Sequence, residues 1–157
     1  MHLTVLTAAS ITALVAAHPL GFSFGDPARM VCAWKNPHLI DAIDQFCSNS
    51  NIVVPSAYGA DGKMVGDSVA WIWPQGDCPQ AWVPQKYCHS QFYETCARGK
   101  MKGYGKMFYG RPGEKQCQVW LLDTKKIHET QIAWSRNGGP PSRGTPPPNY
   151  ATMVDMP

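Results

Sequence analysis

Two stretches of the chain repeat apolar residues at the spacing of an α-helix. The first begins at Asn36-Pro37, where Asn36 supplies a cap and Pro37 suits a first helical turn, and it ends at residues 48–49. Its apolar face is formed by Leu39, Ile40, Ile43, Phe46 and Cys47. The second spans residues 84–98 and stops at Gly99. Its apolar positions are Tyr87, Cys88, Phe92 and Cys96.

Alternating patterns predict strands between and after these helices. In residues 67–73, Val69, Trp71 and Trp73 point to one face, and Ala70 and Ile72 to the other. Further strands are expected at 51–54, 104–109 and 116–122, whereas 127–134 fits either a strand or a short helix. Residues 18–31 suggest an extended lead-in, and 75–83 suggest a loop. The order of elements predicts an α+β fold with an antiparallel sheet flanked by helices.

The two ends of the chain differ from its middle. Residues 1–17 are apolar, contain no Asp, Glu, Lys or Arg, and end in small residues, a pattern typical of a signal peptide cleaved after Ala17. No other apolar stretch approaches the length of a membrane span. Residues 136–157 are rich in proline and glycine, which predicts a disordered tail. We therefore expect an extracellular protein with one domain at 18–135.

Secretion changes the interpretation of the cysteines. The chain has six, which are Cys32, Cys47, Cys78, Cys88, Cys96 and Cys117. In an oxidising compartment they predict three disulfide bonds, whose pairing the sequence leaves open among about 15 arrangements. Cys88 and Cys96 lie ~12 Å apart along one helix, too far to bond with each other. No spacing matches a usual zinc site, so we expect no metal.

Charge gives little support to nucleic-acid binding. The net charge is only +3, with 14 Lys+Arg against 11 Asp+Glu. Residues 98–115 interleave basic and aromatic side chains, as a nucleic-acid platform would, but the solvated face of a hairpin has the same pattern and is favoured by the mild charge. We expect no nucleic-acid partner.

Catalytic chemistry is only weakly indicated. His89 lies within the second predicted helix and is interpreted as a surface histidine, and the carboxylates are scattered, with no local pair of the kind a glycosidase needs. Cleavage after Ala17 would expose His18, whose amine and imidazole can chelate copper, but Pro19 follows and no second histidine is placed. We expect no enzyme activity and no cofactor, with a hydrolase or a copper enzyme as remote alternatives.

Aromatic residues suggest a carbohydrate site. The chain has six tryptophans, and Trp71 and Trp73 share a strand face directly before Gln75 and Asp77. Sugars stack on aromatic rings while their hydroxyl groups reach amides and carboxylates. Burial in the core is the competing interpretation of any tryptophan. The candidate glycan-binding residues are Trp71, Trp73, Gln75, Asp77, Trp82, Tyr104 and Tyr109.

One segment resembles a known family. The run from Cys78 to Cys96, CPQAWVPQKYCHSQFYETC, resembles a motif of fungal small secreted glycan-binding proteins, lectins typified by a mushroom protein that binds fucosylated GalNAc–GlcNAc termini. Asn36-Pro37, Val53–Ser56 and Cys117-Gln118-x-Trp120 add to the likeness, which covers about residues 32–122. The resemblance implies a disulfide-stabilised α/β/α-sandwich-like domain that binds glycans or glycoproteins without catalysis, and it is compatible with edge-to-edge pairing into a homodimer. The proline-rich tail departs from it.

The disulfide scaffold also fits a second class of protein. A small secreted cysteine-rich effector or toxin that acts on a host protein or membrane would need only the leader, the six cysteines and the tail. An interaction that depends on glycans would favour the glycan-binding class, whereas a protein partner bound without competition from sugars would favour the effector or toxin class.

Overall fold

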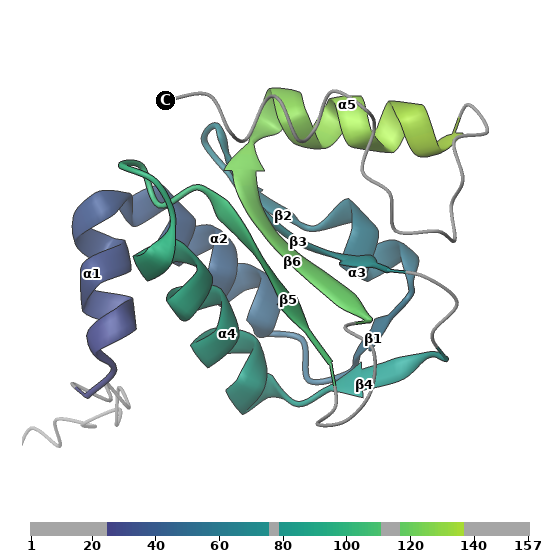
Figure 1. Cartoon of the computed structure of the whole chain (residues 1–157), viewed down its shortest axis with the longest axis horizontal. Helices are drawn as coiled ribbons and strands as arrows, with labels where there is room; N and C mark the ends of the chain where they lie inside the picture. The colour runs from purple at the N-terminus through teal and green to yellow at the C-terminus, as the bar shows by residue number, and fades with distance from the viewer. Residues whose placement is uncertain (1–24, 76–78, 111–116, 137–157) are drawn as a thin grey trace, which may run out of the picture.

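The computed structural model describes residues 25–75, 79–110 and 117–136 (Figure 1). The expected leader at 1–17, Asp77, Cys78 and residues 137–157 of the expected tail lie outside these ranges. The elements, in chain order, are α1 (Pro27–Lys35), α2 (Pro37–Cys47), β1 (Ile52–Val54), α3 (Ala57–Asp61), β2 (Lys63–Val65), β3 (Ser68–Pro74), β4 (Ala81–Val83), α4 (Gln85–Arg98), β5 (Gly105–Tyr109), β6 (Gln118–Thr124) and α5 (Lys125–Arg136).

The centre of the domain is an antiparallel sheet with strand order β2-β3-β6-β5. Strands β1 and β4 form a second, two-stranded antiparallel sheet. Figure 1 shows α1, α2 and α4 on one side of the larger sheet and α5 on the other. This arrangement is the disulfide-stabilised α+β sandwich that the sequence predicts.

The hydrophobic core has two parts, one on each face of β3, as the alternation of residues in this strand predicts. Ala70 and Ile72 join Trp120 and Leu122 of β6 beneath α2 and α4. On the opposite face, a smaller cluster lies under α5 and contains Val69, Trp71, Val119 and Leu121. Every member of both sets is buried, so the sheet is covered by helices on both faces at its centre.

Two disulfide bonds join described cysteines. Cys32 of α1 bonds to Cys96, with Cα atoms 5.3 Å apart, and Cys47 of α2 bonds to Cys88, with Cα atoms 5.6 Å apart. The prediction that Cys88 and Cys96 bond to other partners is confirmed. Cys117 is also disulfide-bonded.

Some local predictions were wrong or incomplete. The lead-in is not extended throughout, because Asp26 accepts a hydrogen bond from Ala28 N at 2.9 Å and starts α1 at Pro27. The expected loop at 75–83 contains β4, which is ordered by pairing with β1. The ambiguous stretch 127–134 is helical and belongs to α5. Within the described ranges, no helix is both long and apolar enough to span a bilayer.

Asn36 is the polar side chain that connects these layers. Its Oδ1 atom accepts hydrogen bonds from His38 N and Leu39 N at 3.1 and 3.4 Å, which caps α2. Its Nδ2 atom donates to Ser68 Oγ at 3.1 Å and to the Lys102 carbonyl at 3.3 Å. One side chain therefore fixes the start of α2 against β3 and against the loop that follows α4.

We predict that Asn36→Ala lowers the free energy of unfolding by about 2 kcal/mol, because it removes the helix cap and the two bonds to neighbouring segments. Urea unfolding with the disulfides intact measures the change. Gln45→Ala, at an exposed position of the same helix, is the matched control and should change stability by less than about 0.5 kcal/mol. Equal effects of the two substitutions would show that the Asn36 contacts do not stabilise the fold.

Candidate functional site

A groove of about 440 Å³ lies where the small sheet meets one end of the large one. Its walls are β4, the first turns of α4, and the adjoining ends of β5 and β6, which Figure 1 shows close together. The side chains that give it its chemistry are Gln80, Trp82, Tyr87, Gln91, Tyr109, Gln118 and Trp120. They come from segments far apart in the sequence, so the groove exists only in the folded chain.

The floor of the groove is aromatic and rigid. Trp120 is fully buried, and its ring lies 4.7 Å from that of Phe92 and 5.4 Å from that of Tyr109 between centroids. The indole Nε1 of Trp120 donates to Gln118 Oε1 at 3.1 Å, and the Tyr109 hydroxyl donates to the Gln91 carbonyl at 3.2 Å. Burial raises the pKa of Tyr109 above its ordinary value.

The rim carries two exposed aromatic rings. Trp82 is 60% exposed and Tyr87 is 48% exposed. Trp82 is held on one side by the pairing of β4 with β1, opposite Val53, and on the other by its Nε1, which donates to the Ser50 carbonyl at 3.0 Å. An exposed ring with a fixed orientation loses little conformational entropy when a ligand stacks on it.

The described lining contains aromatic rings, amides and backbone groups, with no carboxylate, imidazole or cationic side chain among its residues. Such a surface can stack on the apolar face of a ligand and exchange hydrogen bonds with hydroxyl or amide groups. The described lining is therefore suited to stacking and hydrogen bonding with a polar molecule.

The structure brings together only part of the predicted set. Trp82 and Tyr109 both line the groove. Gln75 lies beside it, because its backbone N–H donates to the carbonyl of Cys117, a lining residue, at 2.8 Å. Tyr104 precedes β5 at the end of that strand opposite Tyr109, and its hydroxyl lies 3.2 Å from Ser68 Oγ.

Trp71 and Trp73 do not belong to the groove. Trp71 is buried, and its Nε1 donates to Gln131 of α5 at 3.2 Å, so it packs beneath α5 and does not line the groove, contrary to the expectation that it belongs to the site. Trp73 is half-buried on the same face of the sheet, packed against the cluster beneath α5. The groove lies on the opposite face, because Gln118 and Trp120 alternate with Val119 along β6.

Sequence reasoning missed Tyr87, Gln91, Gln118 and Trp120 as site residues. Tyr87 and Trp120 were noticed, one for helical spacing and the other as part of the family likeness, but neither signal indicates exposure to a ligand. These residues lie close together only because α4 packs against β6.

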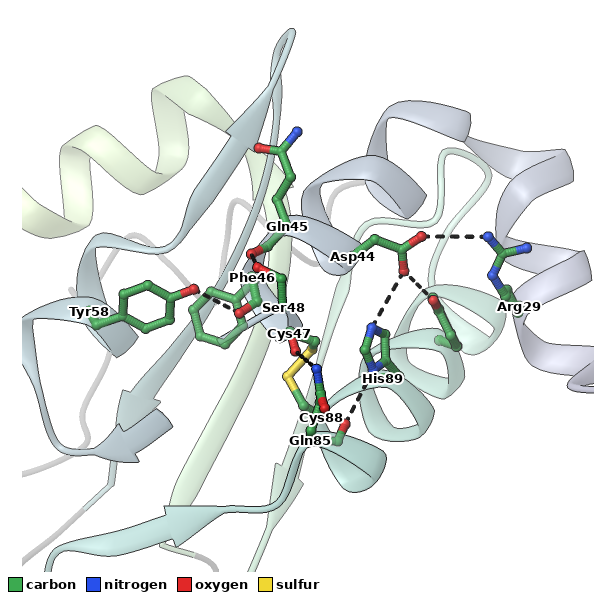
Figure 2. A network of polar contacts seen from close by, with 11 residues as sticks. Arg29, Asp44, Gln45, Phe46, Cys47, Ser48, Tyr58, Gln85, Cys88 and His89 are labelled. Carbon is green, nitrogen blue, oxygen red and sulfur yellow. Dashed lines mark hydrogen bonds and ion pairs between the residues drawn. A yellow bond between two sulfur atoms is a disulfide. The ribbon is translucent and has the colours of Figure 1, made fainter. Parts of the chain in front are cut away.

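A second polar cluster ties three helices together, as Figure 2 shows. Asp44 of α2 accepts a hydrogen bond from the Tyr93 hydroxyl, pairs with Arg29 of α1 at 3.5 Å, and lies 3.7 Å from His89 Nε2. His89 Nδ1 is 3.2 Å from the Gln85 carbonyl. Asp44 therefore has a partner on each of the two neighbouring helices. The cluster lies between α1, α2 and α4, where its contacts fix helix packing.

Comparisons of the chain with protein-family models, with curated proteins and with solved structures found no match. Within the described part of the chain, no three His, Cys, Asp or Glu side chains gather as a metal site. His18, the candidate copper ligand, lies outside that part. The functional argument therefore depends on the groove itself.

The polar cluster predicts how stability depends on alkaline pH. Burial, followed by the hydrogen bond to Asp44, raises the pKa of Tyr93 above its ordinary value near 10. A raised pKa in the folded state means that this stabilisation is complete below about pH 10 and is lost as pH rises further, by up to about 1.4 kcal/mol per pH unit.

We predict that Tyr93→Phe is less stable than the parent protein near neutral pH and that the gap narrows above about pH 10. Urea unfolding between about pH 8 and pH 11.5 measures both proteins under the same conditions. A gap that stays constant over this range would show that Tyr93 titrates alike in the folded and unfolded chains.

Proposed function

We propose that this protein is a secreted, lectin-like protein that binds glycans in the groove between β4 and α4 without turning them over. The observation that carries the proposal is the exposed, oriented indole of Trp82 at the rim of a groove of about 440 Å³. Tyr87 adds a second exposed ring at the same rim.

The chemistry of the groove supports a sugar ligand. A pyranose ring has an apolar C–H face that stacks on an aromatic ring, and its hydroxyl groups need donors and acceptors around the edge. Gln80 and Gln91 place amide or backbone groups beside the aromatic rim. The described lining has no charged side chain, which favours a neutral ligand over a phosphorylated or acidic one.

The remaining parts of the proposal rest on compatible observations. Disulfide bonds formed by fully buried cysteines support folding in an oxidising compartment. The helix-covered antiparallel sheet agrees with the sandwich that the resemblance to fungal glycan-binding proteins implies. Binding to fucosylated termini, and a homodimer formed edge to edge, remain part of the family hypothesis.

We predict that the folded protein binds a defined group of neutral glycans on a glycan array and that Trp82→Ala weakens this binding by at least about tenfold, because the stacking surface is lost. Trp82→Phe, which keeps a ring but not the indole N–H, should retain part of the affinity. Titration calorimetry with the best array ligand measures each variant.

Trp34→Ala is the matched control, because Trp34 is an exposed tryptophan of α1, outside the groove lining. It should bind glycan as the parent protein does. Absence of glycan binding by the folded parent, or equal weakening in both alanine variants, would contradict the proposal. Near-ultraviolet circular dichroism verifies that each variant is folded.

A further inference from the structure

The most exposed residues of α1 are all apolar. The exposed residues of this nine-residue helix are Pro27, Met30, Val31 and Trp34. They are spaced as one helical stripe, and Met30 and Trp34 are 67% and 88% exposed. A surface helix of a soluble protein normally turns such a stripe inward and its charged residues outward.

The charged residues of α1 face the rest of the protein instead. Arg29 pairs with Asp44 and lies over the Tyr93 ring, 5.8 Å from its centroid. Lys35 Nζ donates to the carbonyls of Ala97 and Gly99, both at 2.7 Å, at the end of α4. The inverted orientation of α1 is thus fixed by several contacts, and none of them uses the apolar stripe.

The loop after α4 lies beside the end of α1 and carries another exposed apolar side chain. The bonds from Lys35 to Gly99 and from Asn36 to Lys102 hold the loop beside the end of α1, and Figure 1 shows the two segments together. At the tip of the loop, Met101 is 92% exposed and is flanked by Lys100 and Lys102, which are also exposed. We call Pro27, Met30, Val31, Trp34 and Met101 the α1 surface.

The turn that carries Met101 packs closely against α4 at Gly103. Gly103 has a φ of +73°, and a Cβ atom there would lie 2.6 Å from Cys96 Sγ in the disulfide to α1. Only glycine fits this close approach without strain. The loop tip is therefore positioned by the same disulfide that holds the helix.

We propose that the α1 surface docks on a lipid bilayer that carries anionic headgroups. A tryptophan and two methionines would enter the interface between headgroups and acyl chains, where aromatic and flexible apolar side chains are stabilised. Lys102, which is exposed and follows Met101, would contact the anionic headgroups. Asp26, the acidic residue nearest the stripe in sequence, is engaged in capping α1.

The size of the surface favours a membrane over a second copy of the chain. A stable protein interface buries about 800 Å² on each partner, contributed by some 20–30 residues. The α1 surface has five residues on a nine-residue helix and one loop tip. A bilayer needs no matching surface, and weak insertion can be reinforced by charge attraction.

This surface is separate from the groove, so the inference does not depend on the proposed function. The groove lies against the first turns of α4, whereas Lys100–Lys102 follow its last residue. The 14-residue helix between them is ~21 Å long. A substitution in one surface should leave binding at the other unchanged.

The test is co-sedimentation of the secreted protein with two kinds of vesicle, one of phosphatidylcholine alone and one in which about a third of the lipid is phosphatidylserine. We expect binding to the anionic vesicles and a partition coefficient for Trp34→Ala lower by at least about tenfold. Lys102→Glu should weaken binding to anionic vesicles by at least about fivefold. Trp82→Ala, the matched control, should bind as the parent does.

Several results would overturn the inference. These are no binding to either vesicle, equal binding by the parent, Trp34→Ala and Lys102→Glu, or Trp34-dependent dimerisation in sedimentation equilibrium without vesicle binding. Equal binding by all variants would assign any lipid affinity to another part of the chain. Loss of glycan binding by Trp82→Ala with unchanged lipid binding would support both the glycan-binding groove and the membrane-docking α1 surface. Either proposal can fail without the other.

Discussion

Two disulfide bonds fix both halves of α4, and the rest of the structure is arranged around that constraint. Cys88, in its first turns, bonds to the end of α2, and Cys96, near its last turn, bonds to α1. The bridged cysteines are 41 and 64 residues apart in sequence, and the chain-entropy model gives each bridge about 4 kcal/mol. With α4 held in this way, Tyr87 and Gln91 form one wall of the groove, and the loop after α4 lies against α1.

The contacts that hold α1 to the domain differ from those of most surface helices. A helix of nine residues is marginal on its own, and most surface helices are held by burying an apolar face. In α1 the only fully buried residue is Cys32, Ala28 and Ala33 are partly buried against the core, and Arg29 and Lys35 add polar contacts. A disulfide bond, polar contacts and two small apolar side chains therefore hold α1, while its large apolar side chains face outward.

Local patterns in the sequence predicted much of the fold. The alternation in β3 assigned Val69 and Trp71 to one face and Ala70 to the other, and the Asn36-Pro37 start of α2 was correct. However, the alternation of residues along a strand does not show whether a helix covers either face of the sheet. The residues of α5 fitted strand and helix equally well, so the helix that buries Trp71 could not be placed over the sheet, and Trp71 was taken for a ligand contact.

The groove could be predicted only in part, because it depends on contacts between distant segments. Trp82 reaches it through the pairing of β4 with β1, and Tyr109 and Trp120 reach it through the pairing of β5 with β6. The pattern of residues around Trp82 predicts neither of these strand pairings. The α1 surface was missed for another reason, because residues 18–31 were expected to form an extended lead-in and no helix was predicted at Pro27–Lys35.

The most direct test of this account is hydrogen exchange, followed by mass spectrometry, on a Cys32→Ser/Cys96→Ser variant that keeps the Cys47–Cys88 bond. If the Cys32–Cys96 bond is needed to hold α1, amide exchange in α1 should speed up by at least about a hundredfold, while β3 and β6 keep their protection. Unchanged protection of α1 would contradict the account, because it would mean that packing alone holds the helix. Equal loss of protection across α1 and the sheet would also contradict it, because the disulfide would then support the whole domain and not the placement of α1.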